Sequence, residues 1–242
     1  MAASLTNKVA LITGAGSGIG RAVALQIVRE GGTVALAGRN EAKLLELAAE
    51  ILHSGGDALA IPADVTDPAQ VAHLIAETTR AYETIDIVVN SAGVGLIKPL
   101  DTVTESEIDR LFDTNVKGTI LTTQAALRPM IAGGRGGHII NIAGILGKAP
   151  MANATIYCAS KYAVTGFSKA LQAELGRRHS IKVSLMYFGG VDSPFWDGID
   201  MKVQRDKMLS VTDAANAILY ALTQPSHLVL GEFTLQPDSH QL

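Results

Sequence analysis

Short apolar runs alternate with longer amphipathic segments along the whole chain, and this alternation limits the fold more than any other feature. The apolar runs predict seven strands, and the segments between them predict helices. Because parallel strands need helical crossovers, the alternation favours one α/β domain over residues 1–242, a doubly wound parallel sheet with helices on both faces. The expected strands are 9–12, 33–37, 58–61, 85–89, 138–142, 181–186 and 228–235. The expected helices are 19–30, 41–53, 68–82, 104–131, 156–176 and 212–222.

The composition excludes several classes of protein. With 20 Lys+Arg and 23 Asp+Glu the formal net charge is −3, which argues against a nucleic-acid binder or a polybasic membrane-surface protein. The chain has no apolar run of about 18 residues and no signal-like N-terminal pattern, and its one cysteine, Cys158, cannot form an internal disulfide. The six histidines show no paired ligand spacing, so no metal site is predicted. We therefore expect a cytoplasmic protein without nucleic-acid or membrane partners.

A glycine-rich turn follows the first expected strand. Residues 13–20 read Thr-Gly-Ala-Gly-Ser-Gly-Ile-Gly, with the spacing Gly-x-x-x-Gly-x-Gly. Glycine is needed where φ is positive or where a ligand approaches the backbone, and the helix that follows would point its N–H groups at a pyrophosphate. A tight turn without a ligand is the alternative, but four glycines between a strand and a helix favour a dinucleotide site.

The second expected strand ends at Ala37-Gly38-Arg39-Asn40, without the Asp or Glu that usually binds the ribose hydroxyls of NAD. The Arg39 guanidinium could instead form a forked pair with a 2′-phosphate. The alternative is an ordinary solvated arginine. The sequence therefore predicts NADP(H) over NAD(H).

Tyr157 and Lys161 are spaced by four residues at the start of an expected helix, so their side chains share one face. An ammonium beside a phenol favours the phenolate, and we therefore expect Lys161 to lower the pKa of Tyr157. A tyrosine tuned in this way would transfer protons near neutral pH.

Taken together, these motifs resemble the short-chain dehydrogenase/reductase family. The resemblance rests on residues 13–20, on Asn90-Ser91-Ala92-Gly93, on Asn115 and on Tyr157-x-x-x-Lys161, in the family's order and spacing over essentially the whole chain. It implies a seven-stranded sheet in the order 3-2-1-4-5-6-7, an NAD(P)(H) cofactor and a homotetramer or homodimer.

The resemblance also implies roles for single residues. Tyr157 would donate a proton to a substrate carbonyl oxygen as hydride arrives, and Lys161 would hold the nicotinamide ribose. Asn115 would interrupt its long helix and hold a proton-relay water. The remaining residues expected at the cofactor are Gly14, Ser17, Gly18, Ile19, Gly20, Arg39, Asp64, Val65, Asn90, Ala92, Gly93, Gly189, Val191 and Ser193. For two of them a structural role is the alternative: Asp64 could be a turn or capping residue, and Ser193 could start a turn.

Two positions depart from the family pattern. The family normally has a serine 13 residues before the tyrosine, where this chain has Gly144, and a proline after the sixth strand, where it has Phe188. Losing an oriented donor of this kind costs roughly 10²–10³ in rate, unless Thr155 or Asn153 replaces it. Phe188 would add apolar bulk beside the nicotinamide. The chain is either a natural atypical member or an engineered variant whose chemistry is weakened or redirected.

Residues 194–209 would form a short lid over the substrate, with Trp196 stacking on the substrate or packing on the body. By resemblance, Leu96, Ile97 and Leu146 would line the other wall together with Gly144. Such an apolar pocket favours a small or medium ketone, aldehyde or imine. We expect an NADPH-dependent carbonyl reductase. The alternatives are a cofactor-binding protein without redox turnover and non-redox acid/base catalysis in the same pocket.

Overall fold

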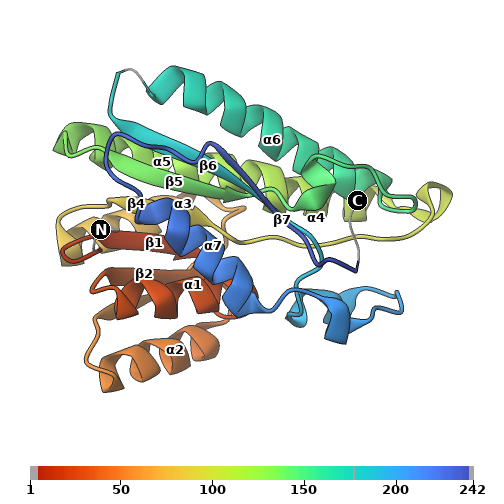
Figure 1. Cartoon of the computed structure of the whole chain (residues 1–242), viewed down its shortest axis with the longest axis horizontal. Coiled ribbons are helices and arrows are strands. Elements are labelled where there is room, and N and C mark those ends of the chain that lie inside the picture. Colours follow the sequence, from red (N-terminus) through yellow and green to blue (C-terminus); the bar gives the residue numbers. More distant parts are fainter. Residues whose placement is uncertain (1–4, 177, 240–242) are drawn as a thin grey trace.

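The computed structural model describes residues 5–176 and 178–239, which form a single α/β domain around one seven-stranded parallel sheet (Figure 1). The strand order is β3-β2-β1-β4-β5-β6-β7, as the family resemblance predicted. The interior strands are almost fully buried because helices cover both faces of the sheet. The strands are β1 (Val9–Thr13), β2 (Thr33–Gly38), β3 (Ala58–Pro62), β4 (Ile87–Asn90), β5 (Gly137–Ile142), β6 (Ile181–Phe188) and β7 (Glu232–Leu235).

Seven α-helices in the described part of the chain form the outer layers. Helices α1, α2 and α7 pack on one face, and α3, α5 and α6 pack on the other, with a separate hydrophobic cluster under each set. A third, smaller cluster lies between α6 and the end of β6. The helices are α1 (Gly18–Arg29), α2 (Glu41–His53), α3 (Pro68–Tyr82), α4 (Glu105–Phe112), α5 (Gly118–Gly133), α6 (Thr155–Leu175) and α7 (Val211–Leu222).

Elements with strong local signals match the sequence prediction most closely. Both α2 and α3 have the expected bounds, and the Asp67 side chain caps α3 by accepting from the N–H groups of Ala69 and Gln70. A proline at the first helical position and an acidic cap define this helix start from short-range chemistry alone.

Two predicted strands were wrong in part, and one predicted helix is interrupted as the family resemblance implied. The expected helix 104–131 is divided into α4, a π-turn at Asp113–Lys117, and α5. The last strand begins only at Glu232, because Leu228 and Val229 are exposed and belong to the loop before it. The fourth begins at Ile87, because the buried Asp86 carboxylate accepts hydrogen bonds from Arg135 and from the Val9 N–H.

In the described part of the chain, no helix combines the length and the apolar character needed to cross a membrane. Within residues 5–176 and 178–239, no three His, Cys, Asp or Glu side chains are grouped so that they could hold a metal ion.

Candidate active site

A cavity of about 1280 Å³ lies at the carboxyl ends of the strands. Sites for drug-sized ligands usually measure about 300–1,000 Å³, so this cavity has room for an extended dinucleotide and a small second molecule. It reaches from Arg39, after β2, to Trp196 in the segment 194–209. The predicted site residues that line it are Gly14, Ser17, Gly18, Ile19, Arg39, Asp64, Val65, Ala92, Gly93, Gly144, Leu146, Tyr157, Lys161, Phe188, Gly189, Val191, Ser193 and Trp196.

Four predicted site residues do not line the cavity: Gly20, Asn90, Leu96 and Asn115. Gly20 is buried behind the turn, where a Cβ would come within 2.5 Å of the Gly14 carbonyl oxygen. Asn90 donates hydrogen bonds to Thr123 Oγ1 and Asn141 Oδ1 beneath the cavity floor. The prediction for Leu96 was wrong, and its neighbour Ile97 forms the wall instead.

The glycine turn packs directly against the loop that follows β4. Gly14 has a φ of +66°, and a Cβ there would lie 2.9 Å from the Ala92 backbone. Thr13 Oγ1 accepts hydrogen bonds from the N–H groups of Ser91 and Ala92, each at 3.2 Å. The turn and the loop therefore hold one another, and together they form one wall of the cavity.

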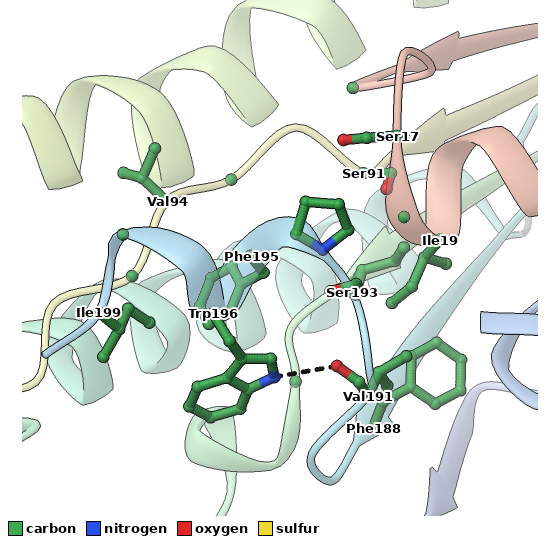
Figure 2. Close-up of a pocket in the computed structure, with 18 of the residues that line it drawn as sticks. Ser17, Ile19, Ser91, Val94, Phe188, Val191, Ser193, Phe195, Trp196 and Ile199 are labelled. Carbon is green, nitrogen blue, oxygen red and sulfur yellow. Dashed lines mark hydrogen bonds between the residues drawn. The ribbon is translucent and has the colours of Figure 1, made fainter. Parts of the chain in front are cut away.

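The start of α1 fits an anionic group. Ser17 is the N-cap residue, yet its side chain accepts no hydrogen bond from the helix. The first N–H groups of a helix have no partner within it, and they bind anions readily. Ser193 lies next to the start of this helix, with its Cβ 3.4 Å from the position a Gly18 Cβ would take (Figure 2). These features fit the diphosphate of a dinucleotide.

Tyr157 and Lys161 lie on the cavity face of α6. Lys161 Nζ donates a hydrogen bond to the Ile142 carbonyl oxygen at 2.9 Å and lies 5.8 Å from the centre of the Tyr157 ring. The Tyr157 hydroxyl has no hydrogen-bond partner within residues 5–176 and 178–239, and its ring lies 5.9 Å from that of Phe195. The hydroxyl is therefore available to a molecule in the cavity.

The expected pKa shift of Tyr157 was wrong in direction. Burial raises the pKa of Tyr157 above its usual value of 10 and lowers the pKa of Lys161 to about 8. The Lys161 ammonium is bound to a backbone carbonyl rather than to the phenol oxygen, so desolvation outweighs charge attraction. Tyr157 is a neutral phenol at neutral pH, which is the form that donates a proton.

Asn115 sits in the π-turn and is buried. Its Nδ2 donates to the Val94 carbonyl oxygen and to Ser160 Oγ, and its Oδ1 accepts from the Val94 N–H. The predicted helix interruption is thus confirmed. The side chain braces the loop after β4 against α6, and its contact with a relay water stays a prediction.

Gly144 follows β5 with a φ of +69° and a ψ of 164°, a combination that is essentially restricted to glycine. Its N–H is already bonded to the Met186 carbonyl oxygen. Apart from its chain neighbours, the one described atom within 4 Å of a Cβ there would be the Phe188 carbonyl oxygen, at 3.9 Å. Space is therefore available, but the backbone conformation opposes any side chain.

The sequence left open whether Asn153 or Thr155 takes the place of the missing serine beside Gly144. Both are exposed and do not line the cavity, so neither replaces the serine hydroxyl. The Phe188 ring borders the cavity, but it is 3% exposed and packs with the cluster under α1, α2 and α7. Strand alternation directs the ring to that face, so it contributes to the core as well as to the wall of the cavity.

Trp196 is held by its own contacts within the segment 194–209, for which the role of a lid stays a prediction. Its Nε1 donates to the Val191 carbonyl oxygen at 2.9 Å, and its ring meets that of Phe195 edge to face at 5.4 Å (Figure 2). This geometry favours packing within the lid, the alternative to substrate stacking. The lid itself contains two short 3₁₀ turns, Pro194–Gly198 and Arg205–Lys207.

The cavity is less uniformly apolar than we expected. Its lining near Tyr157 is apolar, with Ile97, Leu146, Met151 and Phe195, as predicted. Elsewhere the lining carries cations that sequence reasoning missed, and Asp64 is the one acidic residue among the described lining residues. The missed cations are Lys43, Arg110, Lys202 and Lys207.

Gln236 is a further lining residue that the sequence analysis overlooked. The rule that parallel sheets bind ligands after their strands applies to β7 as well, and it could have identified this position.

Comparisons with known proteins agree with this architecture. A family model described as short chain dehydrogenase matches residues 8–204. An uncharacterized oxidoreductase of Staphylococcus aureus (strain MW2) is 40% identical over 233 residues, which cover 96% of this chain and 98% of that protein.

Solved structures show the same likeness. A metagenomic short-chain oxidoreductase in complex with NADP has a TM-score of 0.81 and 32% identity, covering 97% of this chain and 99% of that chain. The 3-ketoacyl-(acyl-carrier-protein) reductase from Brucella melitensis complexed with NADH has a TM-score of 0.89 and 30% identity, with the same coverage. The chain belongs to the short-chain dehydrogenase family.

Proposed function

We propose that this protein reduces a small or medium apolar ketone, aldehyde or imine with NADPH, with Tyr157 as the proton donor. One continuous cavity carries this proposal, because it joins the glycine turn and the start of α1 to Tyr157 and Lys161. The apolar lining near Tyr157 suits a neutral substrate, and the unpartnered phenol supplies the proton that a reduced carbonyl oxygen needs.

A nicotinamide cofactor is supported by the similar structures, one bound to NADP and another to NADH. The end of β2 favours NADP(H) here. Arg39 is exposed and lines the cavity, it forms no ion pair with any described residue, and neither residue directly after the strand, Arg39 or Asn40, carries a carboxylate. Lys43 lines the cavity one helical turn later, and its Cβ lies 3.3 Å from the position of a Gly16 Cβ. Two cations next to the glycine turn suit a 2′-phosphate.

The chain's own groups have distinct roles in this scheme. Bound cofactor supplies the hydride. The raised pKa of Tyr157 keeps its hydroxyl protonated for donation, and Lys161, beside the ring and bonded to the Ile142 carbonyl, would bind the ribose hydroxyls. Phe195 packs near the Tyr157 ring and helps to exclude water from the reacting atoms.

Loss of NADPH absorbance with a panel of ketones, aldehydes and imines tests the proposal. We expect turnover by the wild type and its near-complete loss in Tyr157→Phe. Tyr162→Phe is the matched control, because Tyr162 is on the same helix but bonds to the Lys148 carbonyl oxygen outside the cavity. NADPH loss that is equal in Tyr157→Phe and Tyr162→Phe would contradict the role of Tyr157.

Gly144 favours a second candidate, a protein that binds NADPH without redox turnover, because no side chain donates at this position. Product formed with oxidised cofactor or with none would point to acid/base chemistry in the same cavity. Following cofactor and product together separates the three outcomes.

We also infer a homotetramer or homodimer, which the exposed apolar side chains on α4, α5 and α7 support. Light scattering measures the mass directly. The residues concerned are Phe112, Ile120, Ile131 and Tyr220.

A further inference from the structure

Three neighbouring strands end side by side at the floor of the cavity. Gly144 follows β5, Gly189 follows β6 and Gln236 follows β7, and all three line the cavity. Two of these positions carry no side chain. Gln236 therefore supplies the only side chain in this row of residues.

The Gln236 amide is unusual within the described chain. Its Nε2 is one of two buried side-chain polar atoms that lack a hydrogen-bond partner within residues 5–176 and 178–239, and the other, Thr122 Oγ1, does not line the cavity. Buried amide donors are almost always paired, because an unpaired donor destabilises the fold. A donor kept unpaired at the edge of a ligand cavity indicates a ligand acceptor.

Gln236 is placed to reach the space beside Gly144. The register pairs Phe188 with Leu235, and the Gly189 N–H donates to the Leu235 carbonyl oxygen. Leu235 packs toward α7, so strand alternation directs Gln236 to the opposite face, which carries Tyr187 and α6. A Cβ at Gly189 would lie 3.4 Å from Gln236 Cγ, so the bare Gly189 leaves room for this side chain to cross it.

A substrate oxygen beside Gly144 has few donors to bond among the described residues. The Gly144 N–H is already bonded to the Met186 carbonyl oxygen. The Lys161 ammonium is bonded to the Ile142 carbonyl oxygen, and its other N–H groups are assigned to the ribose hydroxyls in the proposed scheme. Tyr157 is the donor that transfers its proton, and it cannot also fix the orientation of the oxygen from a second direction.

We propose that Gln236 Nε2 donates a hydrogen bond to the substrate carbonyl oxygen and orients it for Tyr157, in place of a hydroxyl at position 144. This inference rests on the proposed carbonyl reduction. In this role Gln236 is a catalytic residue that contacts the substrate from the end of β7.

The test compares wild type, Gln236→Leu and Gln236→Glu in kcat, KM and the NADPH dissociation constant. We expect kcat to fall about 10²–10³-fold in Gln236→Leu, while NADPH binding and the melting temperature stay unchanged. Gln236→Glu keeps the shape and has a donor only when protonated, so its kcat should rise toward wild type as the pH falls. Gln224→Leu is the matched control, since Gln224 lies after α7, outside the cavity, and its amide donates to the Tyr220 carbonyl oxygen.

Several outcomes would overturn the inference. The inference fails if kcat is unchanged in Gln236→Leu. It also fails if the loss of kcat is explained by weaker NADPH binding or by unfolding. A kcat of Gln236→Glu that does not change with pH would contradict it as well. If the wild type turns over carbonyl compounds and Tyr157→Phe does not, these results leave the proposed function intact. If the wild type reduces no carbonyl compound, the proposed function fails and this role fails with it.

Discussion

The Asn115 side chain bonds to both backbone groups of Val94, accepting from its N–H at 2.8 Å and donating to its carbonyl oxygen at 2.9 Å. A third bond, from Nδ2 to Ser160 Oγ at 3.1 Å, extends this connection to α6. The π-turn, the loop after β4 and the helix of Tyr157 are thus held together by one buried amide.

Replacing Asn115 with alanine should lower the free energy of unfolding by about 2–4 kcal/mol, because two partly buried backbone groups of Val94 lose their partners. Denaturant unfolding measures the change. Asn216→Ala removes an exposed amide that bonds to Gln26, and it should cost no more than about 0.5 kcal/mol. An equal loss of unfolding free energy in the two variants would show that the bonds to Val94 stabilise the fold no more than an exposed hydrogen bond does.

Lys161 should make stability depend on pH. Burial lowers its pKa to about 8 in the folded protein, against about 10.4 in an unfolded chain. Between these values the unfolded chain binds the proton and the folded protein does not, so stability rises with pH. We expect wild type to gain roughly 3 kcal/mol relative to Lys161→Met between pH 7 and pH 10.5. A difference between wild type and variant that stays constant across this range would contradict the burial of a titrating ammonium.

A serine at position 144 should not restore an ordinary family site without cost. Because φ is +69° there, Gly144→Ser and Gly144→Ala should each destabilise the fold by about 1–3 kcal/mol, although the site has space for a Cβ. Melting temperatures of both variants measure this strain, and the ratio of their reduction rates isolates the contribution of the hydroxyl. If neither variant is destabilised, the glycine conformation is not required by the loop.

Arg39→Ala should weaken NADPH binding by about 10–100-fold and leave NADH binding nearly unchanged, because only NADPH carries a 2′-phosphate for the charged hydrogen bonds. Lys43→Ala should also weaken NADPH binding more than NADH binding. Fluorescence titration with both cofactors provides the measurement. Arg29→Ala, at the other end of α1, serves as the control. If Arg39→Ala weakens the binding of NADPH and NADH equally, Arg39 does not determine a preference for NADPH.

Short-range chemistry made much of this protein predictable from sequence. Apolar runs and amphipathic segments defined the α/β alternation, and caps such as Asp67 defined helix ends, because these signals act within a few residues. The i, i+4 spacing of Tyr157 and Lys161 placed them together for the same reason, and the expected sheet order was confirmed.

Features that depend on distant partners needed the tertiary structure. The π-turn follows from bonds between Asn115 and Val94, 21 residues away, and the face chosen by Phe188 depends on the register of β6 in the sheet. The pKa of Tyr157 rises rather than falls, because burial of the phenol outweighs the nearby ammonium. By itself the sequence determined the order of elements and the chemistry available. Only the tertiary structure decided which groups are buried, paired or left free to meet a ligand, because solvent exclusion and contacts between distant segments exist only once the chain has folded.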